Sequence, residues 1–272
     1  MNRRKVVIAL SSILAMGFLL TGCGEGARAN IIKISGSSSV GPVIEAEAEA
    51  FKKDMPDLTV EVNQLGSSAG IKDAINGTVE IGISSRDLKE KELEEGVKEK
   101  PIAYDGMSVI INNENPVQNL TIEQIKDIYT GKITNWKEVG GEDTPIVLVS
   151  REDGSGTRDA FQEIVGFNSE EISQQAQISD GSGSIKTMVA GNKNAIGYIS
   201  FSYVDNSVHA VSVDGVKPTA ENVKNKTYKL SRPFLLVYKE DGLNENSKKF
   251  IDFIMSKDGQ EIVQEDGLIS VS

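Results

Sequence analysis

A strand-like run, a turn of glycine and serine, and a helical pattern follow one another at three places in this chain. The first turn is Ser35-Gly36-Ser37-Ser38-Ser39, the second is Gly66-Ser67-Ser68-Ala69-Gly70, and the third is Arg151-Glu152-Asp153-Gly154-Ser155-Gly156-Thr157. Short strands that alternate with helices are typical of α/β folds in which most strands are parallel. The sequence therefore predicts an α/β fold in which helices begin directly after strands.

The rest of the chain continues this alternation. We expect strands at 31–35, 58–62, 79–83, 107–112, 146–150, 195–200, 208–213 and 234–238, and helices at 40–53, 71–75, 158–165, 185–189 and 250–254. Thr121 and Gln124 form a capping-box pattern ahead of a further helix, which Gly131 ends. The chain has 272 residues, of which 39 % are apolar. This is enough for one large or two modest domains with a buried core.

The N-terminus has the pattern of an export signal. A basic segment at 3–5 precedes an apolar run at 6–20, which is too short and wrongly flanked for a stable membrane-spanning helix. The run ends in Leu20-Thr21-Gly22-Cys23. This motif resembles a bacterial lipobox, in which cleavage precedes a cysteine that carries diacylglycerol.

We therefore expect residues 1–22 to be a lipoprotein signal peptide and 23–30 to be a lipid-anchored linker. Acyl chains such as palmitate on Cys23 would hold the protein at the extracytoplasmic face of the cell membrane without spanning it. An uncleaved anchor with a chance cysteine is the alternative. Cys23 is the only cysteine, so no disulfide can form within the chain.

The charge of the chain limits its partners. The formal net charge is −11, and it falls to −14 when the three cations of the signal peptide are removed. So acidic a chain is a poor nucleic-acid binder, because phosphate backbones require clustered Lys and Arg. Any site for an anion must therefore be built locally, from backbone dipoles and one or two buried cations.

The three Gly/Ser turns provide such groups. Each turn places hydroxyl and amide N–H groups at a helix start, where the helix dipole is positive and anions bind. A single turn of this kind can be simply a good N-cap. Three turns that converge would surround a small tetrahedral anion with neutral donors and one guanidinium. Arg151 can supply two parallel N–H contacts, and we expect Asp153 to hold that guanidinium in place.

The Arg151 loop, 151–157, resembles the phosphate-binding loop of the phosphate-binding proteins of ABC transporters. The segments 36–42 and 66–70 resemble the first and second loops of that family, and 120–136 and 201–215 also resemble it. The resemblance covers nearly the whole chain after the signal peptide.

The resemblance implies a periplasmic-binding-protein-like fold of type II. In this fold two lobes, each with a central mixed sheet, are joined by a hinge of two strands. Lobe 1 would comprise 31–111 and 232–272, and lobe 2 would comprise 112–231. The two crossings would lie near 110–113 and 232–236.

The resemblance also implies a set of ligand-binding residues. They are Ser38, Ser39, Val40, Ser67, Ser85, Arg151, Ser155, Gly156 and Thr157. Ser85 lies where many family members have an aspartate that accepts the proton of hydrogen phosphate, and Arg86 follows it. We expect Asp105 either to take over the role of that aspartate or to balance Arg86, and the alternative is that Asp105 only caps a turn.

The function implied is that of a monomeric binding protein, without catalysis, cofactor or metal, that captures inorganic phosphate and hands it to ABC permease subunits. One alternative keeps the fold and changes the ligand to sulfate, molybdate or tungstate. Another is a serine hydrolase, which would need a base beside the serine, and His209 is the only histidine. A role in sensing or adhesion stays open. Metal catalysis has little support, because there is no His/Cys cluster.

Overall fold

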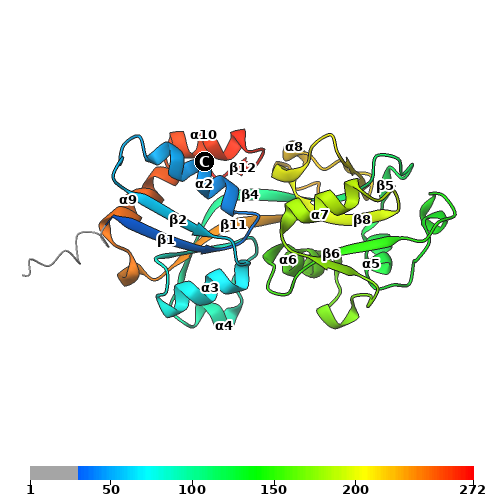
Figure 1. Cartoon of the computed structure of the whole chain (residues 1–272), viewed down its shortest axis with the longest axis horizontal. Coiled ribbons are helices and arrows are strands. Elements are labelled where there is room, and N and C mark those ends of the chain that lie inside the picture. The colour runs from blue at the N-terminus through cyan, green and yellow to red at the C-terminus, as the bar shows by residue number, and fades with distance from the viewer. Residues whose placement is uncertain (1–29) are drawn as a thin grey trace, which may run out of the picture.

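The computed structural model describes residues 30–272. The predicted signal peptide and Cys23 lie outside the described residues. Within residues 30–272, no helix combines the length and the apolar character needed to cross a bilayer. Figure 1 shows two lobes side by side, with strands β4 (Lys98–Ile111) and β11 (Ser231–Tyr238) running between them.

Lobe 1 is a mixed sheet with helices on both faces. Its strand order is β2-β1-β3-β11-β4, where β1, β2 and β3 are parallel and β11 is antiparallel to β3 and β4. The remaining strands are β1 (Ile31–Gly36), β2 (Thr59–Asn63), β3 (Ile81–Ser84) and β12 (Ile269–Ser270), which pairs with β4.

Two apolar clusters hold the helices on the sheet of lobe 1. On one face, α2 (Gly41–Phe51), α9 (Glu245–Ile254) and α10 (Lys257–Glu265) pack through residues such as Ile44, Phe250 and Val263. On the other face, α3 (Ser67–Asn76) and the segment after α4 (Glu90–Leu93) contribute Ile71 and Val97. The sheet is therefore buried on both sides, as the strand–helix alternation predicts.

Lobe 2 repeats this arrangement. The second half of β4 pairs with β8 (Ala195–Ser200), and beyond it lie β6 (Val147–Arg151) and β7 (Gln177–Ser179). The shorter strands are β5 (Asn119–Leu120), β9 (His209–Ala210) and β10 (Ser212–Val213). The helices are α5 (Ile122–Tyr129), α6 (Gly156–Val165), α7 (Gly181–Ala190) and α8 (Ala220–Lys224), with short 3₁₀ turns η1 (Trp136–Val139), η2 (Ser169–Glu171) and η3 (Phe201–Tyr203). A further 3₁₀ turn, η4 (Glu240–Gly242), follows β11 in lobe 1.

The helices of lobe 2 also lie on opposite faces of their sheet. α5, α6 and α8 share one buried cluster, whereas α7 packs into a second cluster through Ile185 and Val189. Phe161 of α6 stacks on Tyr198 of β8 with ring centroids 3.9 Å apart. This stack fixes α6, and with it the loop that precedes it, relative to the sheet.

The pairing of β4 locates the crossing between the lobes. Gly106 is the last residue of β4 that pairs with β11, and from Met107 onward β4 pairs with β8. The first crossing therefore lies a few residues before the predicted 110–113. An apolar run such as 107–111 suits a buried strand in either lobe, so the sequence carries no mark of the crossing. The lobe boundaries at 111 and 231 stay predictions.

The core of lobe 1 contains an acid without a partner. Glu47 of α2 is fully buried, and neither of its carboxylate oxygens has a hydrogen-bond partner in the part of the chain that the structure describes. Burial raises the pKa of Glu47 from its ordinary value of 4.5 to about 8. The folded chain therefore holds this proton more tightly than the unfolded chain does.

We expect this acid to make stability depend on pH. Its favourable contribution is complete below the unfolded pKa, near 4.5, and is lost as the pH rises through about 8, at a rate of roughly 1.4 kcal/mol per pH unit. Glu47→Gln should remove this slope from the free energy of unfolding, measured by urea titration at several pH values. Glu49→Gln, at an exposed position of the same helix, should keep it. Identical slopes in the wild type and in Glu47→Gln would contradict the expectation.

Candidate anion-binding site

Three buried serines of lobe 1 meet where its strands end. Ser37 Oγ donates to Ser85 Oγ at 2.9 Å, and the hydroxyls of Ser67 and Ser85 lie 3.3 Å apart. The Ser85 amide donates to Ser67 Oγ at 3.1 Å. Ser37 follows β1, Ser67 is the first residue of α3 and Ser85 follows β3. The carboxyl edge of the parallel strands therefore brings the three serines together.

Ser39 and Val40 lie beside this cluster at the start of α2. Ser39 is buried and its hydroxyl faces lobe 2, as described below. The Val40 amide donates to the carbonyl oxygen of Ser37 at 3.2 Å. That amide is therefore engaged within its own turn, and α2 presents the Ser39 hydroxyl to the site.

The Arg151 loop forms the part of the candidate site that belongs to lobe 2. It joins β6 to α6, and Ser155 caps α6 by accepting a hydrogen bond from the Arg158 amide at 3.3 Å. Gly156 and Thr157 form the first turn of the helix, whose amides have no partner within the helix itself. Ser155 and Thr157 are both buried.

The two sides touch one another directly. The hydroxyls of Ser39 and Thr157 are 3.0 Å apart, and Arg151 Nη2 donates to Ser38 Oγ at 3.0 Å. The Ser68 amide donates to the Gly154 carbonyl oxygen at 3.1 Å. The turns predicted from the sequence therefore do converge on one place between the lobes.

Gly156 is required by this close approach. A Cβ at this position would lie 2.2 Å from Ser67 Oγ and 2.8 Å from Ser85 Oγ. Any side chain would therefore separate the start of α6 from the serine cluster.

Arg151 places a buried cation where the two lobes meet. Its side chain is only 1 % exposed. Its Nε and Nη2 atoms donate to the two carboxylate oxygens of Glu152 at 2.7 Å each, whereas its Nη1 is buried and has no hydrogen-bond partner within the described residues 30–272. Buried polar groups of this kind are nearly always paired. The free donor is therefore suited to an acceptor that enters from outside the protein.

Two residues outside the predicted set, Ser182 and Tyr203, also contact the serines of the candidate site. The Ser182 hydroxyl at the start of α7 lies 3.3 Å from Ser39 Oγ. Tyr203 of η3 donates its hydroxyl to the Ser38 carbonyl oxygen at 3.0 Å, and burial raises its pKa, so the donor proton is retained. The sequence contains a signal for Ser182, because Gly181-Ser182-Gly183 is a further Gly/Ser segment at the start of a helix.

The prediction that Asp153 holds Arg151 in place is wrong. Asp153 pairs with Arg158 at 3.0 Å, and its side chain is 94 % exposed. Glu152 holds the Arg151 guanidinium instead. Its longer side chain folds back on the preceding residue, whereas Asp153 points outward from the turn.

The prediction that Asp105 substitutes for an aspartate at position 85 or balances Arg86 is also wrong. Asp105 pairs with Arg232 at 2.9 Å and accepts a hydrogen bond from Ser200 Oγ at 2.8 Å. This pair lies on the two strands that cross between the lobes, and both side chains are buried.

Arg86 forms ion pairs with two other carboxylates. It pairs with Glu92 at 2.8 Å and, across the interface between the lobes, with Asp159 of α6 at 3.0 Å. Burial alone would lower the pKa of Arg86, but these two carboxylates outweigh burial and raise it. Ser85 therefore lies beside an arginine that is already neutralised, within a wall made of hydroxyl groups.

Metal-ligand clusters and histidine are the remaining groups considered for catalysis at the candidate site. In the chain from residue 30 onward, no group of three or more His, Cys, Asp or Glu side chains could hold a metal ion. His209 lies on β9, and its buried Nε2 has no hydrogen-bond partner among the same residues.

Two α/β lobes that are joined by crossing strands and meet at buried hydroxyl groups and one guanidinium define a two-lobed solute-binding protein. The sequence profile of the PBP superfamily domain matches residues 23–258.

Known proteins agree with this class. The phosphate-binding protein PstS of Bacillus subtilis (strain 168) is 36 % identical, and the match covers 92 % of this chain and 83 % of the relative. The protein of the same name from Borreliella burgdorferi is 31 % identical, with coverage of 98 % and 99 %.

Among solved structures, a phosphate ABC transporter substrate-binding protein from Clostridium perfringens, with bound phosphate, is 67 % identical with a TM-score of 0.88. The match covers 89 % of this chain and all of the other. A phosphate transport receptor from Vibrio cholerae is 38 % identical with a TM-score of 0.76, and coverage is 88 % and 99 %. The chain belongs to the PBP superfamily and, within it, to the PstS family of phosphate-binding proteins. The predicted fold class is confirmed, and the chain is a binding protein rather than an enzyme.

Proposed function

We propose that this chain captures inorganic phosphate between its two lobes and delivers it to the permease subunits of an ABC transporter. The observation that carries the proposal is the buried, unpartnered Nη1 of Arg151, with the hydroxyl groups of both lobes around it. The names of its relatives support phosphate as the ligand.

The number of donors is sufficient for tight binding. A micromolar Kd corresponds to about 8 kcal/mol, and each hydrogen bond to a charged group contributes roughly 1.5–3 kcal/mol net. Hydroxyl groups, helix-start amides and one guanidinium leave a surplus that offsets desolvation of the anion and closure of the protein. The acidic surface does not prevent this, because the site is shielded by burial.

Phosphate would favour the closed arrangement of the lobes. The contacts of Ser38 with Arg151 and Tyr203, and of Ser39 with Thr157, form only when the lobes are together. A ligand that bridges the same groups shifts the population toward this form. The permease would then recognise the closed protein.

The same proposal includes an extracytoplasmic location. Lipidation of Cys23, after removal of residues 1–22, would keep a monomeric protein at the membrane surface beside its permease. The division into lobe 1 (31–111 and 232–272) and lobe 2 (112–231) belongs to this proposal as well.

Calorimetry of residues 27–272 with phosphate, sulfate and molybdate tests the function. We expect a Kd in the micromolar range or below for phosphate, and weaker binding of sulfate, which brings no proton for a serine hydroxyl to accept. Sulfate that binds as tightly as phosphate would contradict selectivity and favour a general oxyanion receptor. Absence of heat with all three anions would contradict the function itself.

A further inference from the structure

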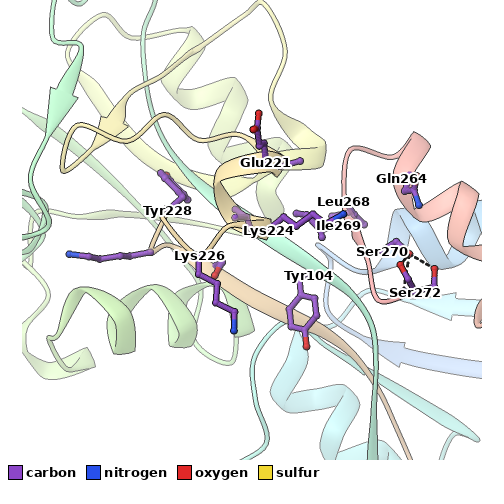
Figure 2. A pocket seen from close by; sticks show the side chains of 14 residues that line it. Tyr104, Glu221, Lys224, Lys226, Tyr228, Gln264, Leu268, Ile269, Ser270 and Ser272 are labelled. Carbon is purple, nitrogen blue, oxygen red and sulfur yellow. Dashed lines mark hydrogen bonds between the residues drawn. The ribbon is translucent and has the colours of Figure 1, made fainter.

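A second cavity lies at the junction of the lobes, apart from the anion site. Its volume is about 840 Å³, and none of its lining residues belongs to the anion site. Figure 2 shows that α8 and the segment after it form one side, and that the C-terminal residues form another. Tyr104 of β4 completes the lining. Both lobes and the crossing strand β4 therefore contribute to it.

The cavity is rich in cations although the chain is strongly acidic. Lys224, Lys226 and Lys229 all line it, whereas the net charge of the chain is −11. Lys229 pairs with Asp214 at 3.0 Å. For Lys224 and Lys226, no ion pair occurs within residues 30–272. The acidic side chain of the lining is Glu221, and Figure 2 shows it directed away from Lys224 and Lys226.

The lining also has an apolar part. Leu268 and Ile269 line the cavity together with Tyr104, whose side chain is 44 % exposed although it is large and apolar. In Figure 2 the Lys224 side chain extends toward Leu268 and Ile269, so a cation and an apolar surface lie in the same cavity. Lys226 has a φ of +59°, a left-handed conformation that favours glycine or asparagine.

We propose that this cavity binds an amphipathic organic anion. Its apolar or aromatic body would lie against Tyr104, Leu268 and Ile269, and its acidic group would bind Lys224 and Lys226. The volume suits a small organic molecule, since such pockets measure about 300–1,000 Å³. Inorganic phosphate, which has no apolar part, does not match the lining. The site is independent of the phosphate assignment.

The fluorescent probe 8-anilinonaphthalene-1-sulfonate, an aromatic anion, tests the proposal with residues 27–272, which contain both lobes. We expect saturable binding at one site. The neutral analogue N-phenyl-1-naphthylamine should bind at least about tenfold more weakly, because it lacks the charged acceptor for the lysines. Lys224→Glu/Lys226→Glu should weaken the binding of the sulfonate by a similar factor. Tyr104→Ala, at an exposed position, should weaken the binding of both compounds.

Lys53→Glu/Lys249→Glu, two exposed lysines outside the cavity, is the matched control and should leave probe binding unchanged. Circular dichroism checks that each variant is folded. No binding to the folded chain, equal binding of the neutral compound, or an equal loss in the control would each overturn the proposal. A probe Kd that rises in proportion to the phosphate concentration would do so too, because it would mean that both ligands share the anion site. If phosphate fails to bind while the probe does, only the proposed phosphate function is contradicted.

Discussion

Arg151→Ala is expected to weaken phosphate binding by on the order of a thousandfold while the protein stays folded. The substitution removes a buried cation whose Nη1 has no hydrogen-bond partner within residues 30–272. The two N–H groups of Nη1 would be lost to the ligand, and each charge-assisted hydrogen bond contributes roughly 1.5–3 kcal/mol. The fold should tolerate it, because Glu152 is 23 % exposed and water can solvate it when its partner is lost. Calorimetry gives the affinity, and thermal unfolding without phosphate gives the stability. Micromolar binding by this variant would mean that the site lies elsewhere.

The two acids that follow Arg151 provide a matched pair of controls. Glu152→Ala should weaken binding moderately, since Glu152 orients the guanidinium through two contacts of 2.7 Å. Asp153→Ala should leave the affinity unchanged, because the Asp153 side chain is exposed and contacts Arg158 instead. Arg151→Lys should recover only part of the lost affinity, because an ammonium group cannot make the two parallel contacts with Glu152 that orient the guanidinium.

Much of the candidate anion site could be predicted because its chemistry is local. A Gly/Ser turn between a strand and a helix needs only a few consecutive residues to be recognised, and the turns at 35–39, 66–70 and 151–157 do meet in space. The turn at 181–183 has the same composition, but the strand before it is short and largely exposed. No apolar run marked that strand, so the contribution of Ser182 was missed.

The partners of the charged residues could not be predicted. Asp105 pairs with Arg232, which is 127 positions away, and Arg86 pairs with Asp159 of the other lobe. Nothing in the spacing of the chain relates such residues, because only the folded sheet and the closed lobes bring them together. The choice between Glu152 and Asp153 depended on the direction of each side chain in one turn.

The limits of the strands were missed for a related reason. β4 begins at Lys98 and not near 107, and its first residues are polar and largely exposed. A strand that emerges from the edge of a lobe has no strict apolar pattern, although its residues from Lys98 to Gly106 pair with β11 across one register shift. The helix at 122–129, by contrast, was predicted with its cap, and Thr121 accepts the hydrogen bond from the Gln124 amide.

Asp105→Ala is expected to lower the free energy of unfolding by about 3–5 kcal/mol. The Arg232 side chain is 1 % exposed, and its Nε and Nη2 donate to Asp105 Oδ2 at 3.0 and 2.9 Å. Without that carboxylate a guanidinium stays buried with no counter-charge. Ser200 Oγ and the Phe201 amide also lose their common acceptor, Asp105 Oδ1. Urea unfolding without phosphate, with the slope compared between variants, measures the loss.

The double variant Asp105→Leu/Arg232→Met distinguishes the attraction between the two charges from the cost of burying them. Burial raises the pKa of Asp105 and lowers the pKa of Arg232, so each charge is costly at this place and the pair offsets that cost. Removing both charges at once should therefore destabilise the protein less than Asp105→Ala does. A loss equal to the sum of the two single losses would show that the residues do not act as a pair. If the pair also fixes the geometry of the crossing strands, the double variant should recover stability but bind phosphate more weakly. Asp105 holds Ser200 and Phe201, and these residues precede Tyr203, which contacts Ser38 across the lobes.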